Sequence, residues 1–272
     1  MYGILDNVKD LGLELEFPPE VFATSFNTAA KPRPDIDFAT LIYPKEFTCS
    51  VCRAKFNFSL VRASKLRMSH MDELHPIYKD IEPLCYDVML CTNCGYAAFK
   101  DRFDVVSEKQ QDLLLEKIRI NYSNFMPCEL PAEIDEVKAI ELYKYALLTA
   151  CIKKTSLGEK AMLFIKLTWL YKVLGDTQNV EFFTKYAYDY LSQAFSSERF
   201  PIFGMSEGAV TFLLASFSAD LGKYGASLKF LSDIIVNKNL STRLRDLARD
   251  KKDEVNELRK EKGITDDQLD ED

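Results

Sequence analysis

The spacing of hydrophobic residues changes near Ser107. Beyond that point apolar residues recur at the three- and four-residue intervals of amphipathic helices, and proline and glycine fall mostly between the periodic segments. This pattern predicts seven helices, over residues 107–122, 134–154, 159–174, 178–195, 206–221, 224–237 and 241–261.

Capping residues and glycines are expected at the ends of these helices. Asp135 and Ser241 are suitable N-terminal caps, because their side-chain oxygens can accept hydrogen bonds from the first free amides of a helix. Three glycines lie where helices are expected to stop: Gly158, Gly175 and Gly222. The last segment alternates charges around one apolar stripe, which is typical of a terminal helix that covers the end of a bundle or solenoid.

Two of the glycines belong to a weak internal repeat. Gly175 followed by Ala187 aligns with Gly222 followed by Ile234, and a third copy at 135–146 lacks the glycine. Small residues at these offsets let the two helices of a hairpin approach closely. The pattern resembles the tetratricopeptide repeat, although the spacing of the glycines exceeds the roughly 34 residues of that repeat. A plain helical bundle is the alternative.

The N-terminal part has a different pattern. Residues 11–17 alternate apolar and polar like a half-buried strand, and short strand-like runs such as 86–90 follow. The fold class expected is α+β, mostly α, with a small β-rich zinc-ribbon-like module followed by an antiparallel tetratricopeptide-like repeat domain. The predicted divisions are an N-terminal extension (1–42), the module (43–105), the helical domain (106–262) and an acidic, disordered tail (263–272).

Composition and charge exclude several classes of protein. Hydrophobic residues make up 47% of the 272 positions, which is too many for a chain that is disordered throughout. A net charge of −7 argues against nonspecific binding of the whole molecule to DNA or anionic membranes. There is no secretory signal pattern, and no run of about 18–20 apolar residues that would cross a membrane. We therefore expect a cytoplasmic protein.

Four of the seven cysteines form two C-x-x-C knuckles. Each knuckle places two thiolates on one tight turn, and two knuckles supply the four sulfur ligands of a structural zinc site. Gly95, directly after the second knuckle, offers the positive φ that such a turn needs. The sequence therefore predicts one structural Zn²⁺ per chain, held by Cys49, Cys52, Cys91 and Cys94.

Two other kinds of cysteine chemistry are alternatives to structural zinc. A thioredoxin-like dithiol requires a βαβ context and gives no reason for a second pair of cysteines. A catalytic zinc requires an open coordination position, and four thiolates leave none. The two histidines, His70 and His75, are expected at the surface or in packing roles. The three remaining cysteines are expected in the core: Cys85, Cys128 and Cys151.

A basic run with interleaved aromatic residues lies between the knuckles. It offers a possible grip on a nucleic-acid backbone, with Phe56 and Phe58 able to stack on bases. The alternative is that these charges offset the zinc–tetrathiolate centre and the acidic residues that follow. The basic residues are Arg53, Lys55, Arg62, Lys65 and Arg67.

Four segments of this region resemble one known family, the bacterial domain of unknown function 2225 family. Residues 49–52 match its first C-P-x-C pattern, and residues 61–67 match an R-x-S-K-L-R-like pattern. Residues 81–88 match N-P-L-Y-Y-D-V, and residues 91–97 match C-P-x-C-G-Y-A. The departures are Ser50, Thr92, Glu82 and Cys85 in place of two prolines, an asparagine and a tyrosine. All four knuckle cysteines remain, so the resemblance implies the same metal site, followed by tetratricopeptide-like helices. It implies no activity.

The function expected is that of a non-enzymatic adaptor whose helical repeats bind a protein or peptide. No phosphate-binding loop, nucleophile elbow or metalloprotease motif occurs in the chain. The helix expected at 159–174 supplies the candidate partner-binding residues, Lys160, Lys166, Trp169 and Lys172. Nucleic-acid binding by the basic run is the alternative function, and a salt-dependent affinity distinguishes the two.

Overall fold

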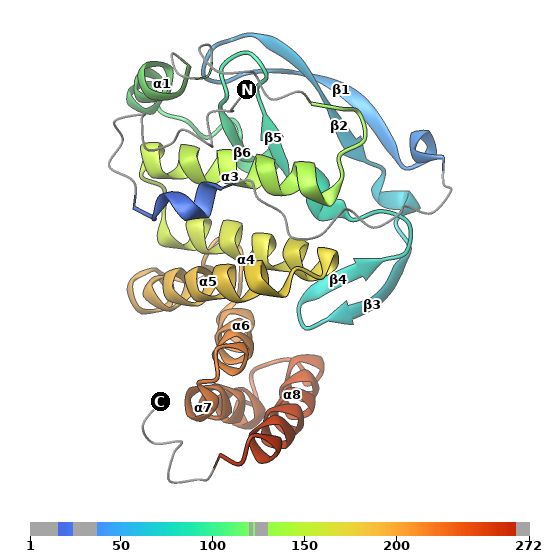
Figure 1. Cartoon of the computed structure of the whole chain (residues 1–272), viewed down its shortest axis with the longest axis vertical. Helices are drawn as coiled ribbons and strands as arrows, with labels where there is room; N and C mark the ends of the chain where they lie inside the picture. The colour runs from blue at the N-terminus through green and yellow to red at the C-terminus, as the bar shows by residue number, and fades with distance from the viewer. Residues whose placement is uncertain (1–15, 24–36, 120–121, 123–129, 265–272) are drawn as a thin grey trace. The chain divides into compact units, whose positions relative to one another are not determined.

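A computed structural model describes residues 16–23, 37–119, 122 and 130–264 (Figure 1). These residues form two compact units. Unit 1 comprises the described residues up to His70 together with Pro76–Thr155 and Trp169–Thr177, and unit 2 comprises Met71–His75, Ser156–Thr168 and the described residues from Gln178 onward. The strand expected at 11–17 and the acidic tail lie mostly outside the described residues.

Short antiparallel strand pairs form the β-structure. The pairs are β1 (Ile42–Thr48) with β2 (Lys55–Val61), β3 (Met68–Asp72) with β4 (His75–Tyr78), and β5 (Val88–Leu90) with β6 (Ala97–Phe99). In the first pair Phe47 lies opposite Phe56, and in the last Leu90 lies opposite Ala97. Single 3-10 turns occupy Pro19–Phe22, Phe38–Thr40, Ala63–Lys65, Pro83–Tyr86 and Lys100–Arg102.

The helices agree closely with the periodic segments of the sequence. They are α1 (Glu108–Leu114), α3 (Glu136–Lys153), α4 (Leu157–Leu174), α5 (Thr177–Ser197), α6 (Glu207–Asp220), α7 (Tyr224–Val236) and α8 (Thr242–Glu261). The fold is therefore α+β and mostly α, as predicted. In the first segment α1 passes into a π-helical turn over Leu115–Arg119, so the helical backbone continues to Arg119.

The helix ends confirm most of the predicted signals. Asp135 accepts a hydrogen bond from the Lys138 amide at 2.7 Å, and Ser241 caps α8 in the same way. Gly175 and Gly222 follow α4 and α6 with φ values of 76° and 78°. The prediction for Gly158 is wrong, because this residue lies in the first turn of α4.

Close packing, and not backbone conformation, requires glycine at position 158. A Cβ atom at this position would lie 2.6 Å from Cγ2 of Ile202, within unit 2. The preceding helix α3 ends instead at Lys154, which adopts the left-handed conformation with φ 52°. Close approach of the 202 segment therefore explains the glycine that the sequence pattern assigned to a helix end.

Helix α3 packs on the β5–β6 pair within unit 1 (Figure 1). The amide of Ala97 donates a hydrogen bond to Oγ1 of Thr149 at 3.3 Å, and the rings of Phe99 and Tyr143 meet edge to face. The structure thus groups α1 and α3 with the cysteine-rich strands, whereas the sequence pattern placed the division at 105/106. The reason is that α3 buries the apolar face of this strand pair.

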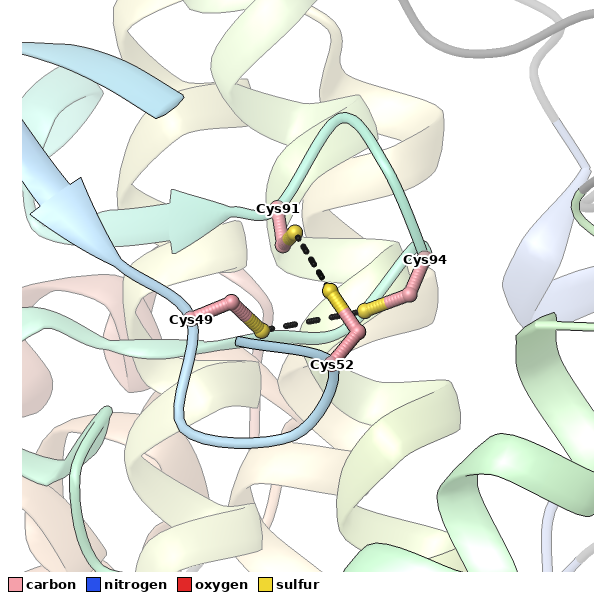
Figure 2. A group of neighbouring side chains, drawn as sticks. All are labelled: Cys49, Cys52, Cys91 and Cys94. Atoms are coloured by element: carbon pink, nitrogen blue, oxygen red, sulfur yellow. Dashed lines mark hydrogen bonds between the residues drawn. The ribbon is translucent and has the colours of Figure 1, made fainter. Parts of the chain in front are cut away.

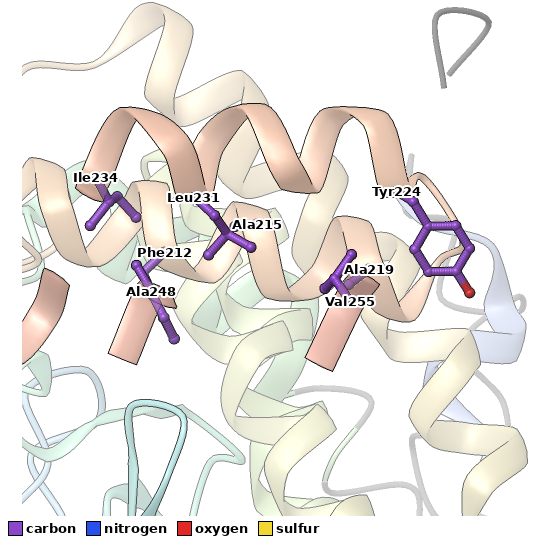
Figure 3. Packing of buried hydrophobic residues seen from close by; sticks show 8 residues of the cluster. All are labelled: Phe212, Ala215, Ala219, Tyr224, Leu231, Ile234, Ala248 and Val255. Atoms are coloured by element: carbon purple, nitrogen blue, oxygen red, sulfur yellow. The ribbon is translucent and has the colours of Figure 1, made fainter. Parts of the chain in front are cut away.

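Unit 2 is built on helices α5 to α8 and the first part of α4. Its core joins α6, α7 and α8 through apolar side chains that converge between the helices (Figure 3). Leu74, in the turn between β3 and β4, packs against the same core. The buried members are Phe212, Ala215, Ala219, Tyr224, Leu231, Ile234, Ala248 and Val255.

None of the helices in the described part of the chain combines the length and the apolar composition that a membrane span requires.

Candidate metal centre

The two cysteine knuckles share one backbone arrangement. Each connects the strands of an antiparallel pair, β1–β2 for the first and β5–β6 for the second. The amides of Cys49 and Cys91 donate to the carbonyls of Ala54 and Tyr96, at 2.9 and 2.8 Å. The local hydrogen bonds therefore close both turns in the same way.

A left-handed residue ends each turn. Arg53 has φ 61° and Gly95 has φ 75°, and their amides donate to the carbonyls of Cys49 and Cys91 at 3.0 and 2.9 Å. The sequence identified this role for Gly95 only. Arg53 was missed because arginine gives no local sign that it adopts a conformation that favours glycine.

Gly95 also permits a close approach within unit 1. A Cβ atom there would lie 2.6 Å from Cδ2 of Tyr122 and 3.0 Å from Cγ2 of Ile118. Both side chains are buried, and Tyr122 packs edge to face against Tyr145 of α3. The second knuckle thus packs against aromatic and aliphatic side chains, and only glycine at position 95 leaves enough room for this contact.

The four cysteine sulfurs form one cluster (Figure 2), all within 4.8 Å of one another. Two of the sulfur–sulfur contacts join opposite knuckles: Cys49 to Cys94 at 3.8 Å and Cys52 to Cys91 at 3.6 Å. Four thiolates at about 2.3 Å from a tetrahedral ion are separated from one another by about 3.8 Å. The observed spacing therefore fits four-sulfur coordination of a metal ion.

Three of the four cysteines in the cluster are buried. Cys49 and Cys91 are 0% exposed and Cys94 is 2% exposed, whereas Cys52 is only half-buried. The hydrogen-bond donors to the sulfurs include the amide of Val51, 3.4 Å from the sulfur of Cys49, and Nδ2 of Asn93, 3.3 Å from the sulfur of Cys52. Such donors stabilise the negative charge that thiolates keep when they bind a metal.

The pKa values of the cysteine thiols also favour the binding of a cation. Hydrogen bonds from the thiols of Cys91 and Cys94 lower the pKa of Cys49 to about 2. The hydrogen bond to Cys49 in turn raises the pKa of Cys91 to about 12, and the pKa of Cys94 is raised for the same reason. Four thiolates so close together repel one another, and a divalent cation is the partner that lets them all ionise.

The residues between the knuckles do not form the predicted nucleic-acid surface in full. Phe56 and Phe58 point into the core, 6% and 1% exposed, because they occupy alternate positions on the inner face of β2. The five basic side chains are exposed, but two have acidic partners: Lys55 with Glu46 at 2.8 Å, and Arg67 with Asp80 through two hydrogen bonds. Arg62 stacks on the ring of Tyr43. The remaining two basic residues are Arg53 and Lys65.

The four candidate partner-binding residues differ in exposure. Lys160 and Trp169 are buried, with 4% and 7% of their surface exposed. The reason is that α4 is apolar on almost every side and is buried accordingly. Lys166 and Lys172 are half-buried, and their role in binding a partner stays a prediction.

Among the described residues, the other cysteines and the two histidines are not part of the cluster. Cys85 and Cys151 are buried, in agreement with the prediction, and Cys128 lies outside the described residues. His70 is exposed and His75 is buried. Within the described ranges, the four knuckle cysteines are the group of histidine, cysteine and acidic residues whose ligand atoms converge closely enough to hold a metal ion.

Comparison with known protein families identifies a match. The family model described as "Uncharacterized protein conserved in bacteria (DUF2225)" matches residues 42–255, which include both knuckles and most of the helices. Neither a curated protein nor a solved structure matches the chain.

Proposed function

Because the chain belongs to the bacterial DUF2225 family, to which no activity is assigned, we propose a function from the site and its scaffold: a non-enzymatic adaptor, stabilised by zinc, that binds a protein or peptide partner. The observation that carries the metal part is the convergence of four sulfurs within 4.8 Å. Four sulfur donors complete a tetrahedral shell and leave no position for a substrate, so a bound ion would stabilise the structure rather than perform catalysis.

Zinc is the ion that this donor set favours. It accepts four thiolates in tetrahedral geometry without a preference imposed by d-electrons, and it does no redox chemistry of its own. When bound, it would link the tips of the β1–β2 and β5–β6 pairs through Cys49, Cys52, Cys91 and Cys94. Short strand pairs bury little apolar surface, so the binding free energy of the ion would contribute directly to the folding of this region.

The adaptor part of the proposal is supported by the helical hairpins. Two residues separate α4 from α5, and three separate α6 from α7, with Gly175 and Gly222 in the turns. Ala187 on α5 and Ile234 on α7 are buried at matching positions after these glycines, as the weak repeat predicts. Stacked helical hairpins present extended surfaces, and such surfaces are widely used to bind peptides and proteins.

The metal is tested by measuring bound elements in the purified full chain by mass spectrometry. We expect about one zinc per chain, and its loss in Cys49→Ser and in Cys91→Ser. The helices of unit 2 should keep their circular dichroism in both variants. Cys151→Ser is the matched control, because its sulfur lies outside the cluster. Iron in place of zinc, or zinc retained in both knuckle variants, would contradict the proposal.

Partner binding is tested by affinity capture from the native extract with and without nuclease. Retention of a protein after nuclease supports an adaptor, and we expect Lys166→Glu and Lys172→Glu to reduce its recovery. Lys185→Glu is the control, because Lys185 is 59% exposed and lies on α5. Nucleic acid in the captured material, or partners lost on nuclease treatment, would instead favour binding through the basic run.

A further inference from the structure

We propose that Cys52 is a redox modification site: peroxide-type oxidants attack the cluster there, and the product is a Cys52–Cys91 disulfide that joins the two knuckles. Access supports the choice of Cys52. Its side chain is half-buried, whereas the other three cysteines are at most 2% exposed. Asn93, whose amide donates to the Cys52 sulfur at 3.3 Å, is itself exposed, so this corner of the cluster faces solvent.

The arrangement of the sulfurs determines the pairing. Two sulfur–sulfur contacts join opposite knuckles, Cys49 to Cys94 at 3.8 Å and Cys52 to Cys91 at 3.6 Å, and the second involves the accessible Cys52 (Figure 2). A thioredoxin-like dithiol forms its disulfide within one C-x-x-C segment. Here the geometry points to a bridge between segments, which follows from folding the two knuckles against each other rather than from their sequence.

The chemistry requires one peroxide and two thiolates. The Cys52 thiolate attacks one oxygen of hydrogen peroxide, the O–O bond breaks, and sulfenic acid and hydroxide form. The Cys91 thiolate then attacks the Cys52 sulfur, forms the S–S bond and expels a second hydroxide. The two sulfurs together lose two electrons to the peroxide, and the two hydroxides take up protons from solvent as water.

Oxidation exchanges one link between the knuckles for another. Two of the four ligands are consumed, so a tetrahedral ion loses half of its shell and is released, while the disulfide keeps the two turns together. The release of zinc rests on the proposed function, because it requires that the site hold zinc. The pairing of Cys52 with Cys91 does not, because it rests only on the 3.6 Å separation of their sulfurs.

The experiment uses the full chain with measured zinc content and hydrogen peroxide as the oxidant. Zinc release is followed with a chromogenic chelator, and disulfides are mapped by mass spectrometry at the half-point of release. We expect one zinc released per Cys52–Cys91 bridge. Asn93→Ala should accelerate release by about threefold or more, since it removes a hydrogen bond to the Cys52 sulfur. Asn93 is exposed and is not one of the four sulfur ligands, so this variant tests the site without removing a ligand.

Cys85→Ala and Cys151→Ala are the controls, and both should release zinc at the wild-type rate. A bridge within a knuckle, such as Cys49–Cys52, would overturn the proposal, as would zinc release without any disulfide or an unchanged rate in Asn93→Ala. A chain isolated without zinc would count against the proposed function alone. Mapping its disulfides would then still decide between Cys52–Cys91 and the competing pairs.

Discussion

The carboxylate of Glu73 and the ammonium group of Lys251 lie 3.2 Å apart in unit 2, with side chains only 9% and 10% exposed. Glu73 occupies the turn between β3 and β4 with φ 53°, and Lys251 lies in the middle of α8. The neighbouring Leu74 packs on the apolar core of α6, α7 and α8. This ion pair and its apolar neighbour explain why residues 71–75 group with unit 2.

Removing one member of this pair should destabilise unit 2. We expect Lys251→Met to cost about 2–4 kcal/mol, because it leaves a buried carboxylate without its lysine. The double variant with Glu73→Gln should cost less than the sum of the single variants. Urea unfolding followed by circular dichroism measures these values. The control is Lys185→Met, which breaks the exposed pair with Glu181 and should cost below about 0.5 kcal/mol. Equal costs for the two lysines would contradict this prediction.

The same pair predicts a dependence on alkaline pH. Burial lowers the pKa of Lys251, but attraction to Glu73 and the hydrogen bond to Glu254 outweigh it and raise the pKa above 10.5. A lysine with a raised pKa in the folded state contributes stability that is fully present below the unfolded pKa and lost as pH rises through the folded value. The melting temperature of the wild type should therefore fall toward that of Lys251→Met above pH 10.5. A constant difference between the two across that range would rule this out.

Gly95→Ala should weaken metal binding. The left-handed backbone costs alanine about 1 kcal/mol, and contact with the Tyr122 ring at 2.6 Å adds about 1–3 kcal/mol of overpacking. Gly175→Ala is a matched control, because Gly175 has φ 76° and nothing within 4 Å of its Cβ position. Zinc affinity from competition with a chelator should fall in Gly95→Ala and stay unchanged in Gly175→Ala. Similar affinities in the two variants would show that the Tyr122 contact has no effect on the site.

Zinc affinity should increase with pH. Before an ion binds, the raised pKa values of Cys91 and Cys94 keep these thiols protonated at neutral pH, whereas the lowered pKa of Cys49 leaves it ionised. Binding therefore displaces at least two protons, and the affinity should rise by about 100-fold per pH unit near neutrality. Chelator competition at two pH values measures the slope, and proton release on titration with zinc gives an independent count. An affinity that does not vary with pH would contradict this assignment of protons.

Arg53 tests the role of the first left-handed position. Arg53→Gly should retain zinc and change stability by at most about 1 kcal/mol, because glycine accepts φ 61° without strain. Arg53→Asn removes the charge but tolerates this backbone, so it should behave similarly. Arg53→Val should lower zinc affinity, because a β-branched residue resists positive φ. Loss of zinc in all three variants would instead indicate that the arginine charge matters.

The sequence by itself determined the local features of this protein. Hydrophobic periodicity predicted the helices to within a few residues, and capping residues such as Asp135 and Ser241 marked where they begin. The spacing of Cys49, Cys52, Cys91 and Cys94 predicted one four-sulfur cluster. These predictions succeed because periodicity, capping and tight turns depend on residues close together in the chain.

Only the tertiary structure decided features that depend on residues far apart in the chain. It brings the sulfur of Cys52 next to that of Cys91 and places Gly158 against Ile202. It also connects residues 71–75 to α8 through the ion pair of Glu73. It also buries Lys160 and Trp169, although their residue types are typical of a binding surface. Such features follow from which apolar faces meet when the chain folds, and the pattern along a single segment shows that a face exists but not what covers it.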